Sequence, residues 1–167
     1  MRNKQAKFIA LGGILAALAM VIMCLGGLIP LATYVCPVIC AILLQILLQL
    51  TSKRIGWAWY ATVAVLSLLF SPDKEAAAVF VFLGYYPLVK SWFDRLPLSW
   101  LFKLLFFTGM ILLAYGSLIY ILGMDAILAE FRELGAVFTG LTLLMGDGVL
   151  LVLDLLLKRI QNLFRRK

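Results

Sequence analysis

Long apolar segments, separated by short polar breaks, recur along the whole chain and constrain its fold more than any other feature. A helix that crosses a bilayer needs about 20 mostly apolar residues. Hydrophobic residues make up 65% of the 167-residue chain and charged residues 14%. This composition excludes a soluble enzyme, a disordered chain and a nucleic-acid-binding domain. We expect one all-α integral membrane domain, residues 1–167, built as a six-transmembrane-helix bundle with spans 8–29, 34–50, 55–70, 75–94, 99–122 and 134–157.

The charged residues predict how this bundle is oriented. With the N- and C-termini on the cytoplasmic side, every basic residue except Lys74 and Arg132 falls on the inner side. This is the distribution that the positive-inside rule predicts. Tryptophans lie near the predicted inner helix ends, where an aromatic belt anchors helices in the lipid interface. These are Trp57, Trp59, Trp92 and Trp100.

An ionisable residue within a span is costly and points to function. Asp147 is the clearest candidate, near the middle of the sixth span between Gly146 and Gly148. Its carboxyl group either binds a cationic or hydroxyl-bearing ligand, takes up a proton, or is a structural group bonded between helices. Asp154 lies two turns further along the same face. Near the inner end of the bundle, Lys103 is its expected partner in a structural ion pair.

Other candidate ligand-binding residues lie on the outer side or at mid-span. Glu75 begins the fourth span, either as a favourable acid at a helix N-terminus or as the rim of an outward-facing cavity. Residues 84–87, Gly-Tyr-Tyr-Pro, predict a kink, so Tyr85 and Tyr86 either line a ligand site or belong to a structural bend. Tyr34 ends an apolar first outer loop that is either a gate or a plain turn. Prolines fall at or near the breaks between spans: Pro30, Pro37, Pro72 and Pro97.

Two further segments suggest interactions. Residues 124–135 predict a short helix in the outer interface, which is either a lid or a plain connector. The first span is rich in small residues, and pairs such as Ala6 and Ala10 allow close helix packing in lipid. That face serves either internal packing or the docking of a partner's helix.

No catalytic or metal-binding pattern emerges. The chain has no histidine and three cysteines, too few ligands for a metal site. Gly146 and Asp147 resemble the Gly-x-Gly-Asp motif of intramembrane aspartyl proteases, but the first glycine and a second mid-span aspartate are missing. We therefore expect neither an enzyme nor a cofactor.

In its size, span number and cytoplasmic termini, the chain resembles the substrate-binding (S) components of energy-coupling factor (ECF) transporters. The similarity includes an alanine-rich first helix, residues 6–10 and 16–19, and the Gly/Pro-containing first outer loop. The resemblance implies a multi-pass protein of the bacterial plasma membrane that binds a micronutrient, such as a vitamin, among the outer halves of its helices. It also implies that Ala6 and Ala10 dock onto a membrane coupling subunit served by two cytoplasmic ATPases. The chain has no nucleotide-binding loop of its own, so those ATPases are separate proteins.

Two other functions stay open. A small membrane scaffold or assembly protein, similar to the cell-shape protein MreD, needs no ligand cavity, and Asp147 would be structural. A stand-alone channel or secondary transporter would use Asp147 as its proton or cation site. If the chain is an ECF substrate-binding component, the candidate ligand-binding residues are Asp147, Glu75, Tyr85, Tyr86 and Tyr34. We expect a ligand that is not strongly anionic, because no basic residue lies at mid-span.

Overall fold

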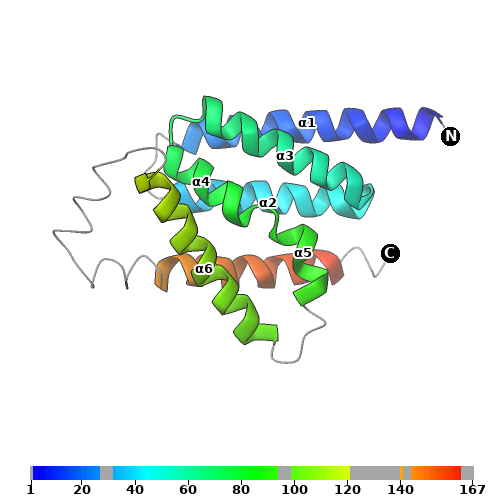
Figure 1. Cartoon of the computed structure of the whole chain (residues 1–167). Helices are drawn as coiled ribbons and strands as arrows, with labels where there is room; N and C mark the ends of the chain where they lie inside the picture. The colour runs from blue at the N-terminus through cyan, green and yellow to red at the C-terminus, as the bar shows by residue number, and fades with distance from the viewer. Residues whose placement is uncertain (1, 27–31, 94–98, 121–139, 141–143, 163–167) are drawn as a thin grey trace.

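The structure is a computed structural model that describes residues 2–26, 32–93, 99–120, 140 and 144–162. Within these residues the chain is helical and contains no strand, so the all-α prediction is confirmed for them. A further helix spans residues 144–162 near the C-terminus (Figure 1). The labelled helices are α1 (Arg2–Gly26), α2 (Ala32–Leu50), α3 (Lys53–Phe70), α4 (Lys74–Leu83), α5 (Tyr86–Phe93) and α6 (Ser99–Tyr120).

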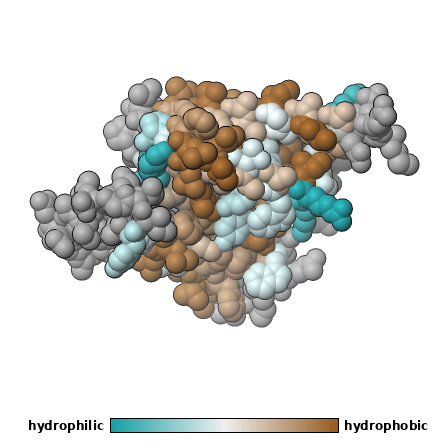
Figure 2. Space-filling model, turned by 45° about the horizontal axis from the view of Figure 1, so that its top comes forward, coloured by the Kyte–Doolittle hydropathy of each residue, from teal (hydrophilic) through white to brown (hydrophobic). Residues whose placement is uncertain are grey.

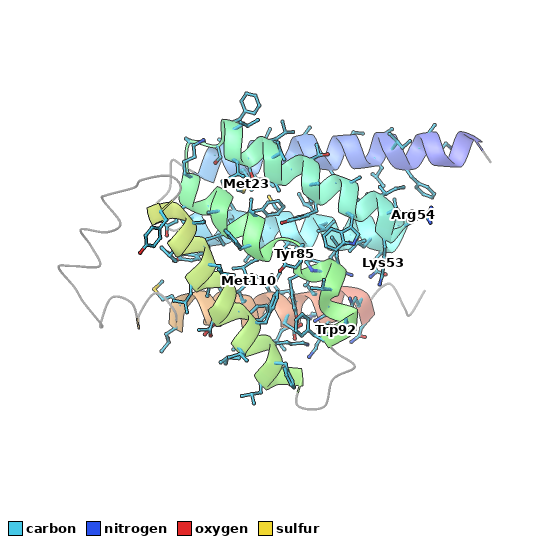
Figure 3. The ribbon with its side chains drawn as sticks, in the orientation of Figure 1. Met23, Lys53, Arg54, Tyr85, Trp92 and Met110 are labelled. Carbon is cyan, nitrogen blue, oxygen red and sulfur yellow. The ribbon has the colours of Figure 1, made fainter. Side chains whose placement is uncertain are left out.

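The helices form one bundle with two distinct ends. Helix α1 packs against α2 and α3, while α4 packs against α2, α3 and α6. Figure 1 shows α1, α2, α3 and the 144–162 helix running along one direction, with α6 slanting across them. The start of α1, the α2–α3 turn and the end of the 144–162 helix lie together at one end, near Lys53 and Arg54 (Figure 3). We call this the basic end, and the opposite end, where α4 begins beside Asp73 and Glu75, the acidic end.

The outer surface of the bundle is strongly apolar. Large side chains on different helices point outward, including Ile9 and Leu105, each 69% exposed, and Leu155, 65% exposed. Figure 2 shows apolar colours over much of the face in view. Two helical segments, Ala6–Gly26 and Thr33–Leu50, are long and apolar enough to cross a membrane. Soluble monomers rarely expose apolar patches of this extent, and such patches mark membrane or protein contact.

The predicted fourth span, 75–94, is divided into α4 and α5, and the predicted kink at residues 84–87 is confirmed as a break in the helix. Pro87 has no N–H to donate to the carbonyl four residues earlier. The Gly84 N–H still bonds the Phe80 carbonyl at 2.7 Å, but Leu88 bonds the Tyr85 carbonyl, three residues back. From α3, the Tyr60 hydroxyl donates to the Val81 carbonyl. That bond supplies a partner for a backbone group next to the break.

Hydrogen bonds at the acidic end tie helix ends together. The Asp73 carboxylate accepts from the Ala76 N–H at 2.9 Å and caps α4. The same carboxylate accepts from the Thr33 hydroxyl at 2.9 Å, which joins the starts of α2 and α4. Ser71 donates to the Met23 carbonyl at 3.2 Å and so links α3 to α1. These bonds satisfy backbone and side-chain groups that helix ends otherwise leave unpaired.

Pro37 lies inside α2, five residues after the helix begins and so near the preceding break. One prediction about an individual residue is wrong. Trp59 is 4% exposed and belongs to the core, so it does not anchor the chain in lipid, whereas Trp57 and Trp92 are 46% and 63% exposed. Trp59 packs into a core cluster with residues of α1, α2 and α4, and Gly12 of α1 lies beside its ring.

Candidate functional site

A cavity lies between four helices in the acidic half of the bundle. Its wall comes from α2, α4, α6 and the 144–162 helix. Nearly all of the wall surface is apolar, and Tyr34 and Tyr115 contribute to it mainly through their rings. The lining residues are Tyr34, Pro37, Val38, Ala41, Val79, Leu83, Gly84, Ile111, Ala114, Tyr115, Gly146, Val149, Leu150 and Leu153.

A chain of hydrogen bonds runs along one side of this cavity. The Tyr34 hydroxyl on α2 is bonded to the Tyr115 hydroxyl on α6. Tyr115 in turn donates to the Glu75 carboxylate in the first turn of α4. Tyr115 is buried, and the two bonds hold three helices together at this level. We call these three residues the tyrosine–glutamate chain.

The cavity is narrow in the structure. Its free space is about 20 Å³, whereas one water molecule needs roughly 10–15 Å³ by the same measure. Pockets for drug-sized ligands usually measure about 300–1,000 Å³. A ligand larger than one or two water molecules therefore has to push the helices apart. Gly146 is one of the tight points, because a Cβ atom there would lie 2.6 Å from Ile111 Cδ1.

The five predicted ligand-binding residues do not form one site. Tyr34 lines the cavity, and Glu75 reaches it through Tyr115. The other three, Tyr85, Tyr86 and Asp147, are absent from the lining. Tyr85 and Tyr86 are adjacent, so their side chains point in different directions, and they belong to different clusters.

Tyr85 belongs to an aromatic cluster between α3, α4 and α6. Its ring stacks on Trp57 with centroids 6.2 Å apart and meets Tyr60 and Phe106 edge-on. The hydroxyl group points toward the Met110 sulfur, 3.8 Å away, and Figure 3 shows both residues near the middle of the molecule. Such offset and edge-on pairs stabilise packing between helices. The cluster fills space rather than leaving a ligand slot.

Tyr86 belongs to a buried ion cluster in the basic half. Its hydroxyl donates to Asp154 Oδ1 at 2.6 Å. The same carboxylate contacts three ammonium groups, those of Lys90, Lys103 and Lys158. The predicted Lys103–Asp154 ion pair is confirmed, with 3.3 Å between Nζ and Oδ2.

Burial makes this cluster energetically important. Lys90 is 0% exposed, Lys103 2% and Asp154 5%, whereas the Lys158 side chain is 49% exposed. Burying charges is favourable only where opposite charges and hydrogen bonds surround them. The cluster therefore fastens α5 and α6 to the 144–162 helix. The sequence gives no sign that Lys90 is a partner of Asp154, because it shows Lys90 only as one of several positive charges on the inner side.

Asp147 is half-buried and faces α6. Its Oδ2 atom is 2.9 Å from the Thr108 hydroxyl oxygen. Its other oxygen, Oδ1, is buried and has no hydrogen-bond partner among the described residues. Asp147 thus sits beside the cavity, next to the lining residue Gly146, without pointing into it.

The remaining predicted positions are also located in part. Ala6 and Ala10 are exposed on α1, close to the basic end. The expected interfacial helix over 124–135 lies outside the described residues, as do residues 27–31 of the first outer loop. Within the described residues, no group of three metal-ligating side chains is found.

Comparison with models of known protein families, with curated proteins and with solved structures finds no match to this chain. The site is therefore interpreted from its own geometry. Of the residues that build it, Tyr115 had no signal in the sequence. It lies in an apolar segment, and only the packing of α6 against α4 brings it to Glu75.

Proposed function

We propose that the chain is the membrane-embedded substrate-binding subunit of an ECF-type micronutrient importer. The observation that carries this proposal is the apolar four-helix cavity in the acidic half, with the bonded hydroxyls of Tyr34 and Tyr115 at its edge. Ligand sites are mostly apolar and contain a few well-placed polar groups, and they often lie between the helices of bundles. The tyrosine–glutamate chain would supply those polar groups.

The proposed topology has six spans with both termini in the cytoplasm. The six crossings would be α1, α2, α3, the α4–α5 pair, α6 and the 144–162 helix. Lys53, Arg54 and Lys158 at the basic end favour the cytoplasm for that end, and Asp73 and Glu75 favour the outside for the other. The cavity would then face the outer half of a bacterial plasma membrane, the side from which a nutrient arrives.

The wall chemistry favours a substrate with a compact apolar body and a group that hydrogen-bonds to hydroxyls. Among the described lining residues there is no lysine or arginine to neutralise an anionic substrate. Because the free space is only about 20 Å³, binding would require α6 and the 144–162 helix to separate. The contact between Ile111 and Gly146 is the place where that separation would begin.

Partners would be a membrane coupling subunit and two cytoplasmic ATPases. The exposed face of α1 that contains Ala6 and Ala10 is the proposed docking surface for the coupling subunit. Small residues let two helices approach closely in lipid. In this proposal the chain binds the substrate, while its partners supply the energy for release.

The narrow cavity also favours a second candidate, a membrane scaffold that binds no small molecule. The first experiment is affinity purification of the tagged chain from its native membranes in mild detergent, with mass spectrometry of the recovered proteins. A polytopic coupling subunit with two ATPases supports the importer, and envelope-assembly proteins support the scaffold. Replacing Ala6 and Ala10 by leucine should reduce recovery of the coupling subunit, whereas Ala61→Leu, on an exposed site of α3, should not.

A matched pair of glycine variants tests the cavity itself. Gly146 lines it, whereas a Cβ atom at Gly148 meets nothing within 4 Å. Gly146→Leu should abolish the thermal stabilisation of the purified protein by vitamins from a screening panel, and Gly148→Leu should preserve it. Equal ligand responses of the two variants would place the binding site elsewhere.

A further inference from the structure

The carboxyl group of Asp147 has contacts that an ionised carboxylate does not explain. A carboxylate has two oxygens that each accept hydrogen bonds and none that donates. The side chain is half-buried, and among the described residues its buried Oδ1 has no hydrogen-bond partner while Oδ2 bonds only to Thr108. An isolated charge in such a place is strongly unfavourable.

The protons around Thr108 can be counted. Its hydroxyl oxygen lies 3.0 Å from the Leu104 carbonyl oxygen and 2.9 Å from Asp147 Oδ2. A threonine hydroxyl has one proton, so Thr108 can donate in only one of these two contacts. The Leu104 carbonyl lies four residues earlier in the helix and already faces the Thr108 N–H, so the hydroxyl proton can point either to it or to Asp147. If Asp147 itself carries a proton, both contacts of Thr108 can be hydrogen bonds at once.

We propose that Asp147 is a proton-binding site, held as the neutral carboxylic acid at neutral pH and donating its O–H to Thr108. Both short contacts of Thr108 are then hydrogen bonds. In the neutral acid, the unpartnered Oδ1 is a carbonyl oxygen. Burying it costs much less than burying a carboxylate oxygen that carries half of a negative charge. Asp147 holds this proton whether the chain serves a transporter or a scaffold.

A proton fits this site better than a metal ion does. Within the described residues there is no cluster of three histidine, cysteine, aspartate or glutamate side chains. Calcium and magnesium take six or more oxygen ligands. Asp147 and Thr108 together offer three side-chain oxygens, one of which already donates to the Leu104 carbonyl.

Other titratable groups nearby have their own contacts. Asp154 is seven residues further on, roughly 10 Å along the helix axis, among the lysines of the ion cluster. On α6, Lys103 contacts Asp154 and Tyr115 donates to Glu75. The titratable groups on the surrounding elements are Tyr34, Cys36 and Cys40 on α2, Lys74 and Glu75 on α4, Tyr86 and Lys90 on α5, Lys103, Tyr115 and Tyr120 on α6, and Asp154, Lys158 and Arg159 on the same helix.

Proton release would place a charge where α6 meets the 144–162 helix. Gly146 and Ile111, the tight pair at the cavity wall, belong to the same contact between these helices. Hydration of an ionised Asp147 would loosen that contact. The proton thereby keeps the two helices closed against each other.

Infrared spectroscopy of the protein in lipid nanodiscs at neutral pH tests the proposal. A protonated carboxylic acid has a C=O stretching band above the amide I band that shifts in D₂O. We expect this band in the wild-type difference spectrum against Asp147→Asn, with circular dichroism confirming that both proteins are helical. A difference spectrum without the band would overturn the proposal.

Stability against pH gives a second readout. Asparagine mimics the neutral acid, since its NH₂ group can donate to Thr108, so Asp147→Asn should fold. The native wild type keeps a proton that the unfolded chain releases. Its unfolding constant should therefore rise relative to Asp147→Asn by about tenfold per pH unit between about pH 5 and about pH 7. A pH-independent ratio would show that Asp147 is already ionised in the folded protein.

Discussion

Replacement of Asp154 by asparagine changes the charge of the buried ion cluster and little else. Asparagine has nearly the same shape and can still accept the Tyr86 hydroxyl. Lys90 and Lys103, 0% and 2% exposed, would lose the carboxylate that both of them contact. Removing one partner of a buried ion pair costs about 3–5 kcal/mol. We expect about 4 kcal/mol, because two buried lysines share this partner while keeping their other contacts.

The assay is reversible unfolding of the purified protein in mixed micelles with increasing SDS, followed by circular dichroism. A loss of about 4 kcal/mol corresponds to an unfolding constant about a thousandfold larger. Lys158→Met is the first control, because Lys158 is half-exposed and contacts the same carboxylate at 3.2 Å. Exposed ion pairs contribute about 0.2–1 kcal/mol, so this variant should change stability little.

Asp147→Asn is the second control, since it makes the same substitution on the same helix. At neutral pH it should cost close to nothing, because the native residue is already neutral in our proposal. If Asp154→Asn costs no more than Lys158→Met, the reasoning about the buried lysines is refuted. If both aspartate variants cost several kcal/mol, Asp147 carries a charge that the fold depends on.

Three further variants test local packing in the same unfolding assay. Gly148→Ala should stabilise the protein by up to about 1 kcal/mol through helix propensity, since the added Cβ meets no atom within 4 Å. Gly146→Ala should give no such stabilisation, because its Cβ would press against Ile111. Tyr60→Phe should cost about 1–3 kcal/mol because the Val81 carbonyl loses its donor, and a cost no larger than that of Tyr85→Phe would contradict this role. Tyr115→Phe should lower the unfolding temperature, because the tyrosine–glutamate chain is broken, and an unchanged temperature would count against that chain.

Much of the helical layout could be predicted from hydropathy and proline positions. The kink at residues 84–87 follows directly from proline chemistry and appears as the α4–α5 break. The Lys103–Asp154 pair follows from two charges placed near the same end of neighbouring helices. Features of this kind depend on one segment, or on two segments whose ends are fixed by the topology.

Predictions that needed side-chain directions across helices were less successful. The burial of Trp59 depends on packing against residues of other helices, and the periodicity of α3 alone does not reveal it. The adjacent residues Tyr85 and Tyr86 end in different clusters because neighbouring side chains point to different sides of the chain, and which cluster each one joins depends on the other helices. Tyr115 became part of the candidate site only through the packing of α6 against α4.

The ion cluster also sets an order for assembly on the ribosome. Lys90 and Lys103 are synthesised 64 and 51 residues before Asp154, their shared carboxylate. Until the last helix emerges, α5 and α6 each carry an ammonium group that lacks this counter-charge, and burying a charge without its partner is costly. The helices α5 and α6 therefore reach their final packing only after the 144–162 helix has been synthesised. A nascent chain arrested before residue 144 should remain open to quality-control proteases, and synthesis of the final helix should end that vulnerability.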